Sequence, residues 1–307
     1  MKAQVPVRTV WRRSVETFFF SNYFLGVLAV ALSVETNLQL SLPLNSGYWY
    51  LVVFSAVVLY YTYAYVRASD TGASNPRTKW YATHSIPVGI SQAFLTILLI
   101  CAIAAFVARY GLQPERVPVA VWWLVALTIG AAAAYYGKLP FFDPRRKGWT
   151  KAATIGWCWA VTVSIMPLVV LQTEMGHLDL SYRLAGWLFL KNWMFCNINA
   201  ILFDIKDYAD DSNRQLKTFV VRYGIRYTIL SIILPMTLLG IGAFLCFAYY
   251  RGFTFTKMLI NLIPFLLTLF VAFSLHKKRS ILYYLIVIDG MLLIKALCGI
   301  SAVRFAM

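Results

Sequence analysis

Charged residues are scarce in this chain, at 13% of its 307 residues. In soluble domains about a quarter of the residues are charged, so the composition argues against a soluble fold. Hydrophobic residues make up 60% of the sequence and its mean hydropathy is +0.67. These values are typical of a membrane protein.

Cysteine is also sparse, and its placement excludes two classes of site. The five cysteines lie far apart inside apolar runs and none has the spacing of a metal-ligand pair. We therefore expect small buried apolar side chains rather than a disulfide framework. No short-period repeat or low-complexity segment is present. The first apolar run is long and lacks a small-residue cleavage site behind it, so we expect no cleavable signal peptide.

The excess of basic residues gives a net charge of +16. Such a charge is compatible with nucleic-acid binding, but the lysines and arginines cluster between apolar runs rather than along one face. This placement follows the positive-inside rule of membrane proteins. The sequence therefore predicts a lipid bilayer, and no nucleic acid, as the partner of these basic segments.

Nine apolar runs each approach the roughly 20 residues that a spanning helix needs. They lie at about residues 15–34, 48–66, 86–109, 117–136, 152–172, 183–203, 228–250, 257–275 and 280–303. We predict an all-α membrane protein in which nine transmembrane helices form one bundle around a central cavity. The whole chain, residues 1–307, is expected to be one domain.

The basic residues in alternate connections predict the orientation. One set of connections holds 20 lysines and arginines and the other holds 6. The N-terminus is therefore expected inside and the C-terminus outside in a multi-pass integral membrane protein. The outer connections, which include Glu35, are short and mildly acidic. Polar chemistry is expected on the cytoplasmic, inner side, between runs two and three and between runs six and seven.

An acidic stretch follows the sixth run. Four of the twelve acidic residues fall within positions 204–211. If the helix of the run continues, Asp204, Asp207 and Asp211 project from one face. Close carboxylates repel one another unless a cation neutralises them, and such oxygen ligands favour Mg²⁺. The alternative is a solvated helix end, which the crowd of basic residues in the same segment disfavours.

This D-x-x-D-x-x-x-D pattern, followed by K-T-x-x-x-R-x-G after the sixth of nine spans, resembles the UbiA superfamily of membrane-embedded prenyltransferases (4-hydroxybenzoate polyprenyltransferase-like). The resemblance implies that Asp204, Asp207 and Asp211 are catalytic Mg²⁺ ligands. It also implies that Lys217 and Arg222 contact the diphosphate. The implied partners are a polyprenyl diphosphate and a hydrophobic or aromatic acceptor.

The first aspartate-rich motif of that family, expected near residues 62–75, is eroded in this chain. Asp70 alone remains acidic, and Arg67 stands where the family has carboxylates. The following positions resemble the basic tail of the motif: Asn75, Arg77 and Lys79. A second Mg²⁺ would lack charge compensation here. Two interpretations stay open: the basic side chains bind phosphate directly, or Arg67 pairs with Asp70 and anchors the helix at the interface.

Polar residues inside the apolar runs are further candidates. Asn197 lies seven residues before Asp204, on its face, where it could contact a substrate or bond between helices. We expect Asp289 and Lys191 to pair with each other or with Lys295, in preference to taking a proton from an acceptor.

Three functions remain open. The first is Mg²⁺-dependent transfer of an isoprenyl group to an acceptor, with cyclisation of the prenyl chain, as in a UbiA-type terpene cyclase, as a variant. The second is cation-coupled transport, which an odd number of spans and a single strong acidic cluster disfavour. The third is a non-catalytic relative that binds isoprenyl phosphates, which the eroded first motif favours.

Overall fold

A computed structural model of the chain describes residues 7–68, 75–136, 148–178, 180–213, 218–275 and 279–305. This part contains helices and no strand. The elements are α1 (Val7–Phe20), α2 (Tyr23–Gln39), α3 (Gly47–Ala68), α4 (Pro76–Thr83), α5 (Ser85–Tyr110), η1 (Pro114–Arg116), α6 (Val119–Tyr135), α7 (Gly148–Ala160), η2 (Val161–Ile165), α8 (Met166–Met175), α9 (Tyr182–Asn213), α10 (Phe219–Tyr223), α11 (Ile225–Thr228), η3 (Ile229–Ile233), α12 (Leu234–Arg251), α13 (Phe255–Ser274) and α14 (Ile281–Phe305).

Every predicted apolar run falls on helix, and the all-α class is confirmed for the described residues. Six helical stretches in this part are long and apolar enough to cross a membrane, and α1 with α2 would make a seventh if the bent pair is one span. The apolar helix α6 is shorter, at 17 residues. Nine spans and the orientation of the two ends remain predictions.

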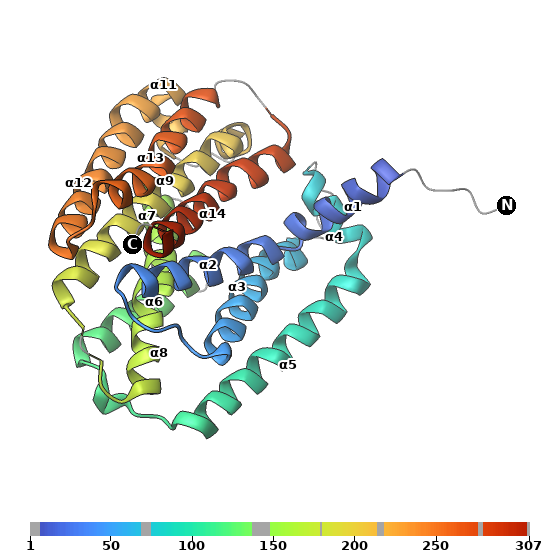
Figure 1. Ribbon diagram of the computed structural model, residues 1–307. Helices are drawn as coiled ribbons and strands as arrows, with labels where there is room; N and C mark the ends of the chain where they lie inside the picture. Colours follow the sequence, from blue (N-terminus) through green and yellow to red (C-terminus); the bar gives the residue numbers. More distant parts are fainter. Residues whose placement is uncertain are drawn as a thin grey trace.

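Helix α9 lies at the centre of the packing. It contacts α7, α12 and α14, while α14 in turn packs on α2 and α13. Bulky buried side chains of α9 fill the core between these helices: Phe195, Ile198, Ile201 and Leu202. Helix α5 lies at the edge of the bundle, where it packs on α3 (Figure 1). The centre of the bundle is therefore the part of the molecule where a polar side chain is withdrawn from lipid.

The first predicted span, 15–34, is bent rather than continuous. Helix α1 ends at Phe20, α2 begins at Tyr23, and their axes differ by 64°. Asn22, between them, has a left-handed backbone with φ of 66° and is fully buried. Asparagine tolerates this conformation better than most residues. The break leaves the last carbonyls of α1 without partners in the helix, which other side chains must satisfy.

Helix α2 also runs further than the predicted span, to Gln39. The prediction that Glu35 belongs to an outer connection is therefore wrong: Glu35 is a fully buried residue of this helix. The π-helix η2 contacts the same part of α2. The π-helix η2 precedes Pro167, whose ring and missing N–H disturb regular α-helical bonding. Thr36 of α2 donates to the carbonyl of Val163 in this π-helix at 2.7 Å.

Candidate functional site

A cavity of about 160 Å³ lies between α9, α14, α7 and the ends of α3 and α4. Its lining contains both polar and aromatic side chains. The polar side chains are Arg77, Lys151, Asn199, Asp204, Lys206 and Asp289. The aromatic side chains are Tyr61, Tyr65, Tyr135, Trp159 and Phe203. Such a pairing of a few polar groups with an apolar wall is typical of a small-molecule site.

The acidic stretch is helical, as the sequence predicts, because α9 continues without a break to Asn213. Its first carboxylate, Asp204, lines the cavity and is 1% exposed. Lys151 of α7 donates to Asp204 Oδ1 across 2.8 Å. A buried carboxylate needs such a partner because desolvation of an isolated charge is costly. The sequence did not indicate Lys151 as a site residue.

Arg77 of α4 also lines the cavity and is 5% exposed. Its Nε and Nη2 donate to the carbonyl of Phe20, at 3.1 and 2.8 Å, and Nη2 also donates to Asn22 Oδ1. Its Nη1 donates to the hydroxyl of Tyr65 at 3.1 Å. The guanidinium therefore satisfies the carbonyl end of α1 left by the break, and cations at a helix C-terminus are stabilised there.

Tyr81 completes this arrangement. Its hydroxyl donates to the Phe20 carbonyl at 2.8 Å and accepts from the Asn22 amide at 3.1 Å. Burial raises the pKa of Tyr81, which keeps the hydroxyl protonated as this donation requires. Its ring stacks on Tyr65 with a centroid separation of 5.1 Å. The hydrogen bonds of Arg77 to Phe20, Asn22 and Tyr65 therefore hold its guanidinium in one position.

Asp289 of α14 lies on the cavity wall and is 5% exposed. The amide of Asn199 on α9 donates to Asp289 Oδ1 at 3.5 Å. The prediction that Asp289 pairs with Lys191 or Lys295 is therefore wrong, because both lysines lie against another carboxylate. Asp289 instead faces the space that a ligand would occupy.

An apolar groove adjoins the polar cavity. It has a volume of about 290 Å³, lies between α3, α6 and α7, and shares Tyr61 and Trp159 with the cavity. The indole N–H of Trp159 donates to the Tyr61 hydroxyl at 2.7 Å. These two side chains form the boundary between the polar cavity and the groove. A group of charged side chains thus lies next to an apolar groove.

Four other predicted site residues do not line this cavity. Asn75 caps α4 by accepting from the backbone N–H of Arg77 at 2.9 Å, and Lys79 is exposed on the same helix. Arg222 is exposed, with its guanidinium 5.1 Å from the ring of Tyr223. Asn197 donates to the Trp193 carbonyl and lies against Gly156, where α7 and α9 approach closely.

The remaining predicted residues lie outside the described part in whole or in their side chains. Asp70 and Lys217 are outside it. For Arg67, Asp207 and Asp211 only the helical backbone is described. Asp207 and Asp211 nevertheless follow Asp204 by three and seven positions on α9, so the three lie on one helix face. Their roles, and the pairing of Arg67 with Asp70, stay predictions.

The donor set determines how a metal ion would fit. Within the described side chains, no three His, Cys, Asp or Glu residues converge on a common point. Asp204 offers a buried carboxylate on the wall of the cavity, and hard oxygen donors of this kind suit Mg²⁺. On α9 the described carboxylate of Asp204 is therefore a donor that suits such an ion, and its completion by Asp207 and Asp211 stays a prediction. On the described residues of α3 and α4 the cavity is lined by tyrosines and Arg77, which do not fit a cation.

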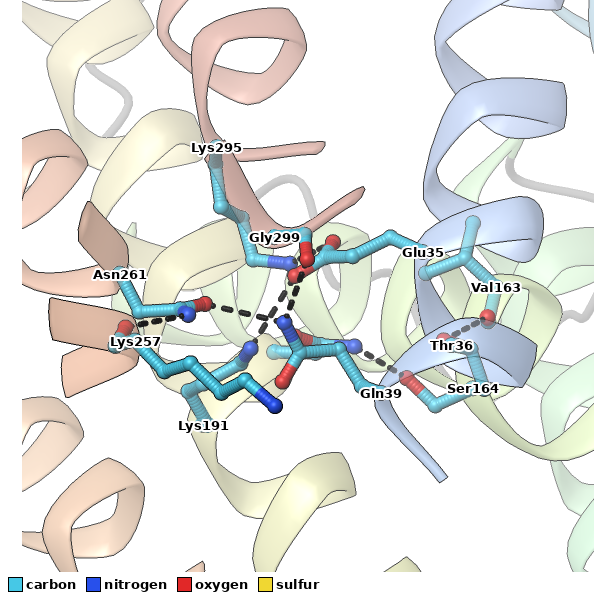
Figure 2. A network of polar contacts seen from close by, with 11 residues as sticks. Glu35, Thr36, Gln39, Val163, Ser164, Lys191, Lys257, Asn261, Lys295 and Gly299 are labelled. Atoms are coloured by element: carbon cyan, nitrogen blue, oxygen red, sulfur yellow. Dashed lines mark hydrogen bonds and ion pairs between the residues drawn. The ribbon is translucent and has the colours of Figure 1, made fainter. Parts of the chain in front are cut away.

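Figure 2 shows a second cluster of polar side chains within the bundle. The carboxylate of Glu35 on α2 contacts the ammonium of Lys191 on α9 at 3.1 Å and that of Lys295 on α14 at 2.5 Å. All three side chains are at most 3% exposed. Gln39 extends the cluster by donating to Asn261 and to the Gly299 carbonyl. This cluster joins α2, α9 and α14, and all three helices also contribute residues to the cavity beside Asp204.

Sequence reasoning missed Asn22 and Lys151, as well as the burial of Glu35. The signal for Asn22 was a polar Ser-Asn pair inside an apolar run. The signal for Glu35 was the presence of two intramembrane lysines, Lys191 and Lys295, that require a buried anion. Lys151 lies in a basic connection, and its nearness to Asp204 follows only from the packing of α7 on α9.

Comparison with known proteins gives one family. The model of the UbiA prenyltransferase family matches residues 69–281, more than half of the chain. Neither a curated protein nor a solved structure gives a significant match. The matched range contains Arg77, Lys151 and the acidic stretch of α9, while Asn22, Glu35, Asp289 and Lys295 lie outside it. The chain therefore belongs to the UbiA prenyltransferase family, and its apolar helices agree with a multi-pass membrane protein of this family.

Proposed function

We propose that the protein transfers an isoprenyl group from a polyprenyl diphosphate to a hydrophobic or aromatic acceptor, and that the reaction takes place in the cavity beside Asp204. Family membership supports prenyltransferase activity in general. The observation that carries the specific proposal is that a cavity with charged side chains and an apolar groove lie side by side and share Tyr61 and Trp159 in their linings. An isoprenyl diphosphate has the same division into a charged head and an apolar tail.

The head would lie between Arg77, Lys151 and Lys206, whose charges oppose those of phosphate oxygens. Asp204, with Asp207 and Asp211 further along α9, would hold Mg²⁺ beside it. When bound, this ion offsets the negative charge that the leaving diphosphate acquires. The active site would open to the inner side of the membrane, where the basic connections are predicted.

The aromatic wall supports the second half of the reaction. Ionisation of the allylic carbon–oxygen bond leaves a cation that is attacked rapidly by water. Tyr61, Tyr65 and Trp159 line the cavity. In the proposed reaction these rings would limit access of water and stabilise the positive charge. The adjoining groove would hold the prenyl tail in a fixed direction.

Asp289 is placed to complete transfer to an aromatic acceptor. Such an acceptor forms a carbon–carbon bond to the prenyl cation and must then lose a proton. The Asp289 carboxylate lines the cavity and keeps one oxygen near the Asn199 amide. We assign it the role of proton acceptor. Lys191 and Lys295 pair with Glu35 instead of Asp289, so Asp289 is left on the cavity wall.

Release of diphosphate tests the proposal. Purified protein is incubated with Mg²⁺, labelled geranylgeranyl diphosphate and a panel containing 4-hydroxybenzoate and 1,4-dihydroxy-2-naphthoate. We expect released diphosphate and a prenylated product, both lost in Asp204→Asn. Tight binding of the diphosphate with no release under any acceptor would instead favour a non-catalytic relative, which the ion pair of Asp204 with Lys151 makes the second candidate. Release with a cyclised hydrocarbon product would favour a terpene cyclase.

A further inference from the structure

The described part of the cavity lining differs in charge from helix to helix. Helix α9 presents both Asp204 and Lys206, whereas the described residues of α3 and α4 present Tyr61, Tyr65 and Arg77 and no carboxylate. Arginine cannot ligate a metal ion, since its guanidinium stays protonated and has no acceptor. Among the described residues of α3 and α4, a metal ion would therefore meet the positive charge of Arg77 instead of a carboxylate ligand.

Arg77 is held so that its charge stays in the cavity. Its bonds to Phe20 and Asn22 engage the hydrogens of Nε and Nη2, and its bond to Tyr65 engages one hydrogen of Nη1. A guanidinium has five N–H donors, so a second hydrogen of Nη1 remains for a ligand. Because the side chain is 5% exposed, a phosphate oxygen here would be bound in a poorly hydrated site, where charged hydrogen bonds are strong.

Lys151 of α7 supplies a second cation to the cavity lining. Its ammonium lies 2.8 Å from Asp204 Oδ1 and is 13% exposed, so it already neutralises the carboxylate that begins the acidic stretch. An ammonium has three donors and can bridge this carboxylate to a phosphate oxygen. Lys206, on the same helix as Asp204, adds a third cation to the cavity lining. Among the described side chains of the lining, two carboxylates, Asp204 and Asp289, stand against these three positive charges.

On this basis we propose that Arg77, Lys151 and Lys206 bind the phosphate groups of an isoprenyl phosphate lipid directly and take the place of a second metal ion. The inference rests on the proposed function, since it concerns the same cavity. It has two consequences. The lipid binds without any divalent ion, and the protein takes up no more than one Mg²⁺ per chain when the lipid is present.

Equilibrium binding tests this inference without a need for the acceptor. Labelled farnesyl diphosphate is titrated into the purified full-length protein in detergent micelles, in EDTA and in Mg²⁺, with farnesol as the ligand that lacks phosphate. We expect the Kd in EDTA to stay within about tenfold of the Kd in Mg²⁺, and farnesol to bind far more weakly. Bound magnesium, measured by elemental analysis, is expected to reach at most one ion per chain.

Other outcomes separate the inference from the function it rests on. Binding in Mg²⁺ that is lost in EDTA, or two bound ions per chain, would overturn the inference and leave the proposed function standing. Absence of binding in both conditions would overturn both. Equal binding of farnesol and farnesyl diphosphate would also overturn the inference, because the cations would then contribute nothing.

Variants assign the effect to the named cations. In EDTA, Lys151→Gln is expected to weaken farnesyl diphosphate binding about tenfold, since one charge-assisted bond is lost. Arg109→Gln, at the exposed end of α5, removes the same charge away from the cavity and is expected to leave the Kd unchanged. Arg77→Gln also removes the anchor of α1, so its Kd is interpreted only if its melting temperature matches that of the wild type. An unchanged Kd in Lys151→Gln would contradict the proposal whatever Arg77→Gln does.

Discussion

Lys151 of α7 lies 2.8 Å from Asp204 of α9, and both side chains line the same cavity. The carboxylate that heads the acidic stretch is thus neutralised on one oxygen by the protein itself. Removal of one partner from a buried pair leaves an uncompensated charge. The pair therefore ties the position of α7 to that of the functional segment of α9.

The metal assignment predicts a large effect at Asp207. Asp207→Asn removes a negative charge from the face of α9 that would hold Mg²⁺, so Mg²⁺-dependent release of diphosphate should fall by about 100-fold. The measurement is the initial rate of release from geranylgeranyl diphosphate at saturating Mg²⁺. Glu115→Gln, in the exposed turn η1, serves as the control for loss of one acidic charge. Wild-type turnover in Asp207→Asn would remove this residue from the metal site.

The buried cluster of Glu35, Lys191 and Lys295 predicts an effect on the stability of the fold. Glu35→Gln leaves Lys191 and Lys295 buried without their shared anion, and we expect a loss of about 3 to 5 kcal/mol of folding free energy. The corresponding fall in melting temperature in detergent is about 5 °C or more. If the lysines are also replaced by methionine, much of the loss should be recovered, because a triple variant no longer buries unpaired charge. A melting temperature unchanged by Glu35→Gln would show that the cluster is not structural.

Gly299 predicts a steric test of the same cluster. A Cβ at this position would lie 2.6 Å from both Cγ and Oε1 of Glu35, closer than atoms can approach. Gly299→Ala should therefore displace the Glu35 carboxylate and destabilise the protein by about 1 to 3 kcal/mol. Gly290→Ala on the same helix is the matched control, because its Cβ would meet no atom within 4 Å. Equal melting temperatures for the two variants would contradict the observed packing.

The apolar groove predicts a dependence on prenyl chain length. Ala132 lines this groove, so Ala132→Phe should reduce its volume and disfavour long tails. We expect the ratio of kcat/KM for geranylgeranyl over geranyl diphosphate to fall by about tenfold. Leu127→Phe adds bulk to the same helix at an exposed position outside the groove, and should leave the ratio unchanged. A ratio that does not respond to Ala132→Phe would mean that the tail lies elsewhere.

Local pattern predicted the helices and the most informative segment. Apolar runs of spanning length fall on helix throughout the described residues, and α9 continues through Asp204 because nothing in that stretch interrupts helical bonding. The family followed from the spacing of the aspartates and is confirmed by the match over residues 69–281. These features depend on neighbours along the chain, which a sequence displays directly.

The partners of the buried charged side chains depend on tertiary contacts, which the sequence does not display. Asp289 and Lys295 lie six positions apart on α14, yet one faces the cavity and the other faces Glu35. The partner of Lys295 comes from a helix about 260 positions earlier in the chain. Arg77 was a predicted phosphate ligand, but its bonds to the broken end of α1 could not be foreseen, because the break itself depends on Asn22 meeting Thr62, Arg77 and Tyr81.

A structure with a bound geranylgeranyl thiolodiphosphate, which resists ionisation, tests the central claim most directly. The account predicts phosphate density within hydrogen-bonding distance of Arg77 and Lys151, beside Asp204, with the tail running past Trp159 into the groove between α3, α6 and α7. Density for the phosphates at another surface, with the cavity beside Asp204 left without ligand, would contradict it.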